Sequence, residues 1–182
     1  QKITKAMKMV AAAKMRKDQK LMENGLPFCQ PVASLFERLP AEERSGSVTY
    51  LAVTSDKGLC GGVNSAVNKQ IRLGVLDEEA KGNSAKVMIV GGKGVAGLKR
   101  IFGDRFAVTF EETSKSPWSF ATASMIAERV ILAKPNRFKI VNNEFKSMVS
   151  YDTHVANTVT LHEATTMDKV EWSKAMDVYS FE

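Results

Sequence analysis

The first 24 residues of the chain, QKITKAMKMVAAAKMRKDQKLMEN, carry one uninterrupted helical pattern. No Pro or Gly occurs before Gly25, and Ala, Met and Lys are good helix formers. Apolar side chains recur at intervals of three and four residues, which places them on one face of a helix. They are Ile3, Ala6, Met7, Val10 and Ala13. At about 1.5 Å per residue, a helix of this length spans roughly 35 Å.

The opposite side of this predicted helix is basic. Lys5, Lys8 and Arg16 lie there, and Lys14 interrupts the apolar seam. Residues 1–20 hold seven Lys or Arg and one acidic residue, whereas the rest of the chain holds 19 of each sign. The net charge of +6 therefore lies on one helix, which favours docking to an acidic partner over nucleic-acid binding. The narrow seam favours a coiled-coil strand, with an amphipathic helix packed on its own domain as the alternative.

Length and composition limit the number of domains, the membrane spans and the disulfides that the chain can have. A chain of 182 residues suits one domain with an appendage, and 44% hydrophobic residues can supply a core. No apolar run approaches the roughly 20 residues of a membrane span, so we expect no direct membrane insertion. Cys29 and Cys60 lack CxxC spacing, which predicts two free thiols. The chain begins with Gln1 rather than Met, which indicates processing or trimming.

Three regions are predicted along the chain. Residues 1–40 form the helical region, in which Pro27 and Pro31 predict a kink or a restart near 25–31. A polar connector leads to an α/β domain over residues 48–164. Residues 165–182 lack a clear pattern, and we expect an irregular tail there.

Within the α/β domain, strand and helix patterns alternate. Predicted parallel strands cover 48–53, 86–90 and 106–110, and helices begin near residues 63, 92 and 117. This alternation predicts a Rossmann-like, mostly parallel sheet with helices on both faces. The third helix is expected to bury one apolar face, made of Phe120, Ala123, Ile126, Ala127, Val130 and Ile131.

After Pro135 the apolar period changes to two, which indicates strands. We expect an antiparallel hairpin at the edge of the sheet. Its first strand alternates through Val141, Phe145, Val149 and Tyr151, and its second through Val155, Val159 and Leu161.

One motif favours an enzyme. Gly92, Gly94 and Gly97 spell G-x-G-x-x-G directly after a predicted strand, and Glu112 follows at the end of the next strand. In dinucleotide-binding domains such glycines admit a pyrophosphate to a helix N-terminus, and the acid binds ribose hydroxyls. Tight βα turns also select glycine for purely steric reasons, and no candidate catalytic residues gather nearby. A dinucleotide-binding enzyme domain is therefore the alternative function.

Other candidate sites are weaker. Cys60 lies near a helix start but has no identifiable His or acid partner, so we expect a buried or idle thiol rather than a nucleophile. His154 and His162 fall in the terminal hairpin without the Cys or acid pair that a metal site needs. We therefore expect no catalytic residues, no cofactor and no metal.

Two stretches resemble a known family. KITKAMKMVAAAKMRK closely resembles the N-terminal helix of the γ subunit of rotary ATP synthases, and SDKGLCGGVNSAV resembles that family's signature turn after the first strand. FKSMVSY is more similar to the mitochondrial branch than to the bacterial one. The match runs in order through about residue 163. The residues that carry the signature turn are Ser55, Asp56, Gly58, Cys60 and Gly61.

The resemblance implies a non-catalytic central-stalk rotor subunit. In the family, the N-terminal helix pairs with a C-terminal helix as an antiparallel coiled coil inside the ring of α and β catalytic subunits. The α/β domain forms a foot with small central-stalk subunits on the membrane rotor ring. Such a subunit couples proton-driven rotation to conformational change and lies on the matrix side of the mitochondrial inner membrane.

The resemblance also implies roles for single residues. The side chains expected to face an acidic loop of the catalytic subunits are Lys5, Met7, Lys8, Lys14 and Arg16. Those expected in the coiled-coil seam are Ile3, Ala6, Val10 and Ala13. No second long helix follows before Glu182, so the other half of the coil is expected to have been trimmed, to belong to another chain or to have been lost.

Overall fold

The computed structural model describes residues 2–38, 45–58, 60–147, 149–160 and 165. The chain forms two compact units, residues 1–39 and residues 40–182. We call them the N-terminal helix and the α/β domain. The predicted irregular tail lies outside the described residues apart from Thr165.

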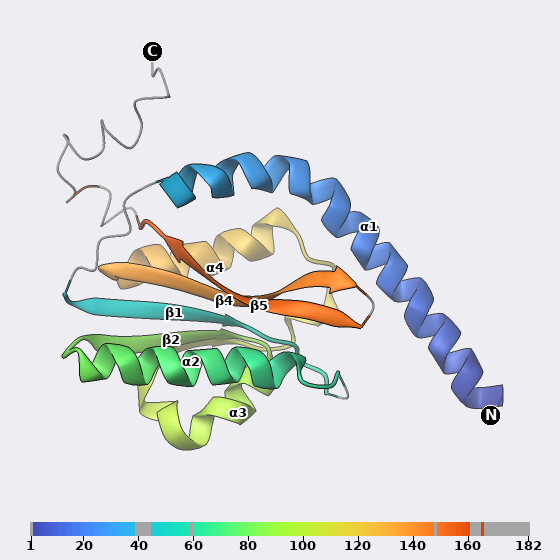
Figure 1. Ribbon diagram of the computed structural model, residues 1–182, viewed down its shortest axis with the longest axis horizontal. Helices are drawn as coiled ribbons and strands as arrows, with labels where there is room; N and C mark the ends of the chain where they lie inside the picture. The colour runs from blue at the N-terminus through green and yellow to red at the C-terminus, as the bar shows by residue number, and fades with distance from the viewer. Residues whose placement is uncertain (1, 39–44, 59, 148, 161–164, 166–182) are drawn as a thin grey trace, which may run out of the picture. The chain divides into compact units, whose positions relative to one another are not determined.

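The N-terminal helix is α1 (Lys2–Arg38), 37 residues long. It continues through Pro27 and Pro31 as one helix that bends along its length (Figure 1). A proline inside a helix removes one backbone donor and crowds the preceding turn, which bends a helix without having to end it. The long N-terminal helix that the residue pattern predicts is therefore present. Its pairing into a coiled coil stays a prediction.

The α/β domain is built on a five-stranded sheet with strand order β3-β2-β1-β4-β5 (Figure 1). The strands are β1 (Ser47–Val53), β2 (Ser84–Val90), β3 (Phe106–Phe110), β4 (Arg137–Ser147) and β5 (Ser150–Thr158). The first four pair in parallel, and β5 runs antiparallel to β4. This confirms the predicted α/β class with a mostly parallel sheet and a terminal antiparallel hairpin.

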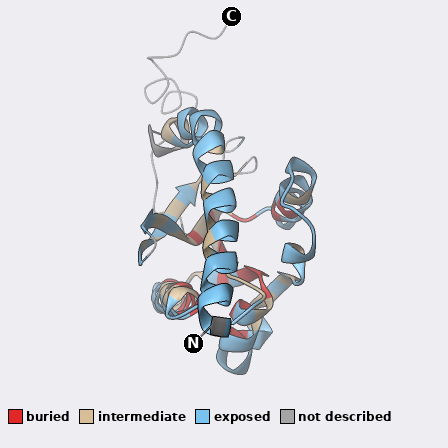
Figure 2. Cartoon of the chain, turned by 90° about the vertical axis from the view of Figure 1, so that its right-hand side faces the viewer, coloured by how far each residue is buried: buried red, intermediate tan, exposed pale blue. Residues whose placement is uncertain are grey.

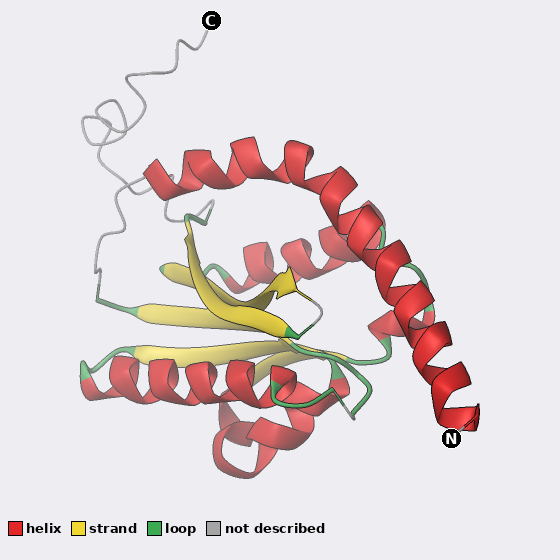
Figure 3. Cartoon of the chain, turned by 45° about the vertical axis from the view of Figure 1, so that its right-hand side comes forward, coloured by secondary structure: helices red, strands yellow, loops and turns green. Residues whose placement is uncertain are grey.

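Helices lie on both faces of the sheet (Figure 3). Side chains of α2 (Val63–Ala80) and α3 (Gly92–Phe102) pack on one face, and α4 (Phe120–Ala133) packs on the other. Short 3-10 turns, η1 (Gly103–Arg105) and η2 (Thr113–Lys115), flank β3. The strand sequence of β1, VTYLAV, supplies both cores because alternate side chains point to opposite faces. Buried residues therefore concentrate on the sheet and on the inner sides of its helices (Figure 2).

The hairpin differs from its prediction in where the chain turns. β4 ends at Ser147 and β5 begins at Ser150, so Val149 lies in the turn and Tyr151 belongs to the second strand. Tyr151 pairs with Phe145 across the hairpin. Alternation of apolar residues continues through such a tight turn, so the sequence pattern alone did not mark it. Leu161 lies outside the described residues.

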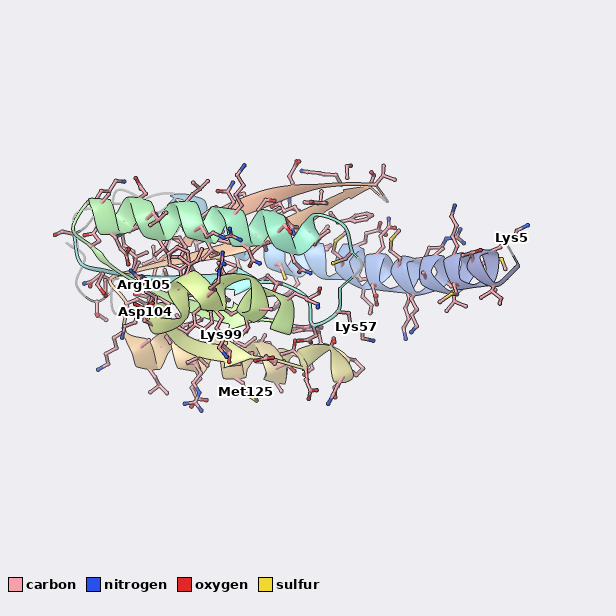
Figure 4. All side chains as sticks on the ribbon, turned by 90° about the horizontal axis from the view of Figure 1, so that it is seen from below. Lys5, Lys57, Lys99, Asp104, Arg105 and Met125 are labelled. Carbon is pink, nitrogen blue, oxygen red and sulfur yellow. The ribbon has the colours of Figure 1, made fainter. Side chains whose placement is uncertain are left out.

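The expected buried face of α4 is partly wrong. Ile126 and Val130 are buried against the sheet, but Phe120 and Ile131 are 83% and 54% exposed. Met125 also projects from α4 into solvent (Figure 4). The helix starts at Phe120, with Ser119 Oγ accepting a hydrogen bond from the Thr122 N–H, and not at Pro117. Among the described residues of the domain, only the side of α4 that faces the sheet is covered.

Candidate functional site

The basic helix α1 presents its predicted contact residues to solvent. Ile3 is 78% exposed, and Met7 and Val10 are also exposed. The same holds for Lys5 (labelled in Figure 4), Ala6, Lys8, Ala13, Lys14 and Arg16. Because the apolar seam is exposed, it does not stabilise the helix by packing. Helices without tertiary packing are only marginally stable in water. The seam and the basic face are therefore both available to other surfaces.

The signature turn is tied to the first turn of α2 by the side chain of Asn64. The Asn64 Oδ1 accepts from the Ser55 N–H at 2.9 Å, and its Nδ2 donates to the Cys60 Sγ at 3.1 Å. The Ser55 Oγ donates to the Lys57 carbonyl at 2.6 Å. Asn64 is buried, and these bonds anchor the partly exposed turn to the start of α2. Sequence reasoning missed Asn64, although it stands within the quoted motif.

The two glycines of the turn have different roles. Gly61 has φ +63°, a left-handed conformation that side-chain-bearing residues rarely adopt. A Cβ built at Gly58 would lie 3.2 Å from the Lys93 Cε, which belongs to a flexible side chain and can move aside. The expectation for Cys60 was a buried or idle thiol, and because Cys60 is exposed, the buried alternative is wrong. Both Cys60 and Cys29 are free thiols, as expected.

Asp56 joins three elements through one carboxylate. Its Oδ1 accepts from the Gly92 N–H at 3.0 Å and from the Glu112 N–H at 2.9 Å. Its Oδ2 accepts from the Ser114 N–H at 3.3 Å and the Ser114 Oγ at 3.0 Å. Burial acts to raise the pKa of Asp56, but the backbone donors outweigh it and lower the pKa below the usual value. The carboxylate thus stays ionised and holds the turn to α3 and to the end of β3.

Packing within the domain accounts for two of the three glycines of the G-x-G-x-x-G motif. A Cβ at Gly94 would lie 2.6 Å from the Thr54 Oγ1, and one at Gly97 would lie 2.1 Å from the Asn68 Nδ2. A Cβ at Gly92 would meet a flexible carboxylate oxygen at 3.2 Å. Gly94 and Gly97 therefore allow α3 to approach the turn and α2 closely.

The proposed ribose-binding acid is also engaged elsewhere. The Glu112 Oε2 accepts from the Lys115 Nζ at 2.5 Å, and Glu112 itself has φ +60°. Asp56 lies at the N-terminus of α3, where the dinucleotide hypothesis needs a pyrophosphate. The geometry therefore does not favour the dinucleotide-binding alternative.

A buried charge cluster was not predicted. The Glu78 carboxylate of α2 accepts from Arg137 and Lys139 of β4 and from the Asn83 Nδ2 at 2.8 Å. Burial acts to raise the pKa of Glu78, but the hydrogen bonds from these three donors outweigh it and lower the pKa to about 2. Burial, and then the charge of Glu78, raises the pKa of the adjacent Tyr50 to about 12. In the sequence, Glu78 stands between two other acids and resembles a solvated helix face.

The described parts of the chain offer little metal chemistry. The His154 Nδ1 lies 3.7 Å from the Glu144 Oε1, and both side chains are exposed. His162 lies outside the described residues. Within the ranges that the structure describes, no three or more His, Cys, Asp and Glu residues are grouped to hold a metal ion. Within these ranges no helix is long and apolar enough to cross a bilayer.

Comparison with known proteins gives the family. The ATP synthase family model matches residues 1–182, so the chain belongs to the ATP synthase family. The two relatives described next are gamma subunits. It is 35% identical over 176 residues to the mitochondrial ATP synthase subunit gamma of Drosophila melanogaster, covering 94% of this chain. It is 33% identical over 174 residues to the ATP synthase gamma chain of Phenylobacterium zucineum, covering 87% of this chain.

Solved structures of ATP synthases contain chains with a similar fold. A chain in the central stalk and c-ring of the Tetrahymena thermophila mitochondrial ATP synthase superposes with a TM-score of 0.73 at 26% identity. That likeness covers 99% of this chain and 79% of the other. A chain of the Euglena gracilis mitochondrial ATP synthase shares the fold, with a TM-score of 0.68 at 20% identity. The sequence relatives and the Tetrahymena structure favour the gamma-subunit hypothesis over the dinucleotide-binding one.

The chain is shorter than its relatives. It spans 57% of the length of the Drosophila relative and 60% of that of the Phenylobacterium relative. These relatives therefore contain polypeptide that has no counterpart in the 182 residues.

Proposed function

We propose that this chain acts as the non-catalytic shaft of an ATP synthase, coupling proton-driven rotation of a membrane ring to conformational change in the catalytic subunits. The observation that carries the proposal is helix α1: 37 residues long, basic, and exposing both an apolar seam and its lysines. Membership of the ATP synthase family supports the same function.

The partners follow from the two units. The basic face of α1, with Lys5, Lys8 and Arg16, faces acidic segments of the α and β catalytic subunits, and Met7 and Lys14 contact the same subunits from the side of the seam. The apolar seam pairs with a second helix as a coiled coil. The α/β domain meets the small central-stalk subunits and the membrane rotor ring. The complex is peripheral to the mitochondrial inner membrane, on its matrix side.

The mechanism is mechanical and needs no catalytic residue in this chain. A helix whose faces differ in charge presents a different surface to each catalytic subunit as it turns. Contact with the helix changes the equilibrium between the open and closed states of a catalytic site. The size of the change equals the difference between the contact free energies of the helix with the two states. The basic face of α1 supplies that difference by charge, and the apolar seam holds the shaft together.

The test is a triple charge reversal in the assembled complex: Lys5→Glu, Lys8→Glu and Arg16→Glu. Exposed ion pairs contribute roughly 0–1 kcal/mol each, so one reversal is mild and three add up. We expect the complex to assemble, as judged by native gel electrophoresis, but to lose most of its proton-driven ATP synthesis relative to wild type.

Two comparisons make the test specific. A matched reversal of three exposed lysines on the α/β domain, Lys69→Glu, Lys86→Glu and Lys99→Glu, changes the net charge equally and should leave synthesis near wild type. Ile3→Asp with Val10→Asp should instead lower the yield of intact complex, because it breaks the seam. Normal synthesis in the α1 triple variant would show that its charge has no role in coupling.

A further inference from the structure

Helix α4 is apolar around most of its circumference. Its sequence, FATASMIAERVILA, contains only two charged residues. A helix that is apolar all round is normally buried on all sides. In α4, however, the buried residues are Ile126 and Val130 alone. Met125 and Leu132 are 60% and 63% exposed, so the side of α4 that faces away from the sheet is an apolar surface without a cover among the described residues.

The outward side of α4 carries two adjacent rows of exposed side chains, because residues three and four apart share one side of a helix. The first row consists of Ala121, Met125, Glu128 and Leu132, and the second of Phe120, Ser124, Ala127 and Ile131. Large apolar side chains stand beside small ones in both rows, so a second segment can approach the helix closely. Glu128 is the one charged residue of the two rows. A contiguous apolar surface of this kind marks a contact site.

The two faces of the sheet are covered unequally. On one face, α2 and α3 contribute five side chains to the buried core: Val67, Ile71, Val75, Leu98 and Phe102. On the other face, α4 contributes two, and four sheet side chains below it are only partly buried. These four are Val53, Val108, Phe110 and Ile140. A further segment is therefore needed on the α4 side to complete this layer.

The chain leaves the sheet beside the C-terminal end of α4. The Thr160 hydroxyl donates to the Pro135 carbonyl at 3.1 Å, and Pro135 directly follows Lys134, the C-cap of α4. Residues 166–182 begin a few positions further on and lie outside the described residues. The 14 residues of α4 span about 21 Å. A segment as long as 166–182 covers that distance in any backbone conformation from helical to extended.

The sequence of residues 166–182, TMDKVEWSKAMDVYSFE, supplies side chains that match this surface. Trp172, Met176 and Tyr179 are separated by four and three residues, a spacing that places them on one side of a helical segment. Lys169 precedes Trp172 by three residues and falls on the same side. It carries the charge that complements Glu128. This pattern is too short to predict a structure by itself, but it fits the outward side of α4 in both apolar character and charge.

We propose that residues 166–182 cover the outward side of α4 and run back along the helix from its C-terminal end. Trp172 and Met176 face α4, and Lys169 lies near Glu128. The segment thereby clamps α4 to the sheet and completes the apolar layer on this face. The inference concerns the packing of this chain alone and does not rest on the proposed shaft function.

The first test measures the accessibility of α4 in the full chain. The two native cysteines are replaced by Ser, and Met125→Cys introduces one thiol on the outward side of α4. We expect this thiol to react with a maleimide about tenfold more slowly than in the same chain carrying Trp172→Ser and Met176→Ser, which corresponds to a docked fraction of about nine-tenths. Leu73→Cys on the exposed side of α2 is the control, and its thiol should react equally fast in both chains.

The labelling rates also distinguish the other possible occupants. Equal rates for Met125→Cys with and without the two Ser substitutions would overturn the proposal and leave α4 free for a partner subunit. Protection that increases with protein concentration would overturn it in favour of a second copy of the chain. Protection that is independent of concentration and lost with the Ser substitutions is the result that supports it.

A disulfide experiment in the same cysteine-free background tests the direction of the segment. A disulfide forms only where the two Cα atoms come within about 7 Å. We expect Leu132→Cys with Lys169→Cys to form an intramolecular disulfide on mild oxidation, identified by mass spectrometry of the linked peptides. Leu132→Cys with Tyr179→Cys is the matched control and should form much less, because Tyr179 lies toward the opposite end of α4. Equal yields from the two pairs, or intermolecular disulfides alone, would contradict the proposed docking.

Discussion

The Glu78 carboxylate of α2 and the Arg137 guanidinium at the start of β4 lie 2.5 Å apart, with side chains 1% and 11% exposed. Lys139 lies 3.0 Å from the other oxygen of the same carboxylate. The cluster connects α2 to β4. Glu78 and Arg137 are 59 residues apart in the sequence. Buried charges of this kind are costly to leave unpaired, so the cluster specifies how α2 sits on the sheet.

Replacing Glu78 by Gln should destabilise the α/β domain strongly. Removing one partner of a buried ion pair typically costs about 3–5 kcal/mol, because the remaining charges stay buried without compensation. Chemical denaturation followed by circular dichroism measures the free energy of unfolding.

The matched control is the neighbouring residue. Asp77 is exposed and pairs with Lys81 across one turn of the same helix. Asp77→Asn should therefore change the free energy of unfolding by roughly 0.5 kcal/mol or less. Equal effects of the two substitutions would mean that the buried cluster does not stabilise the domain.

Acid should remove the stabilisation that the ionised Glu78 carboxylate provides. The pKa of Glu78 falls from its usual value near 4.5 to about 2 in the folded chain. A lowered pKa stabilises the fold at pH values above 4.5, and this stabilisation is lost as the pH falls from about 4.5 to about 2. The amount is on the order of 3 kcal/mol. Unfolding curves between pH 6 and pH 2 should show this loss in wild type and a much weaker one in Glu78→Gln.

Gly97→Ala should disrupt the contact between α3 and α2. The new Cβ would meet the Asn68 Nδ2 at 2.1 Å, and Asn68 is nearly fully buried. Overpacking of this kind costs about 1–3 kcal/mol. Gly103→Ala is the control, because its Cβ would meet its nearest neighbour, Lys99, at an ordinary 3.8 Å. Thermal unfolding that finds both variants near wild type would argue that α3 can shift away from α2.

Helix α1 should exchange its amide protons much faster than β2 (Ser84–Val90) in the isolated chain. Its apolar seam is exposed, and a helix without packed neighbours is only marginally stable in water. Hydrogen exchange followed by mass spectrometry compares the two segments directly. Protection of residues 3–24 equal to that of β2 would indicate that the helix packs on its own domain, the alternative that the residue pattern left open.

Sequence patterns predicted the elements well where a single physical requirement dominates. A long run of helix formers without Pro or Gly predicted the start of α1, and continuous apolar runs predicted β1 and β2 because both faces of these strands are buried. The change of period after Pro135 predicted the antiparallel hairpin. These signals are local, so they can be recognised without knowledge of the tertiary contacts.

The same patterns did not predict burial correctly where the exposure of a side chain depends on the neighbouring elements. Phe120 and Ile131 share the apolar stripe of α4 with Ile126, yet only the latter meets the sheet. Periodicity gives the direction of a side chain around a helix axis, and it does not say how wide the contact is. The packing agrees with the steric explanation of the G-x-G-x-x-G motif, since a Cβ at Gly94 or Gly97 would clash with Thr54 or Asn68.

The class of the fold, the long basic helix and the family resemblance could all be predicted from residue patterns, because each depends on local composition or on contiguous motifs. The contacts of individual polar residues could not be predicted in this way, because they depend on the folded arrangement of distant segments. Asp56 meets donors 36 to 58 residues away, and Glu78 meets bases 59 and 61 residues away. A carboxylate in a turn or on a helix is indistinguishable from a solvated one until the fold brings its donors together and removes the water between them.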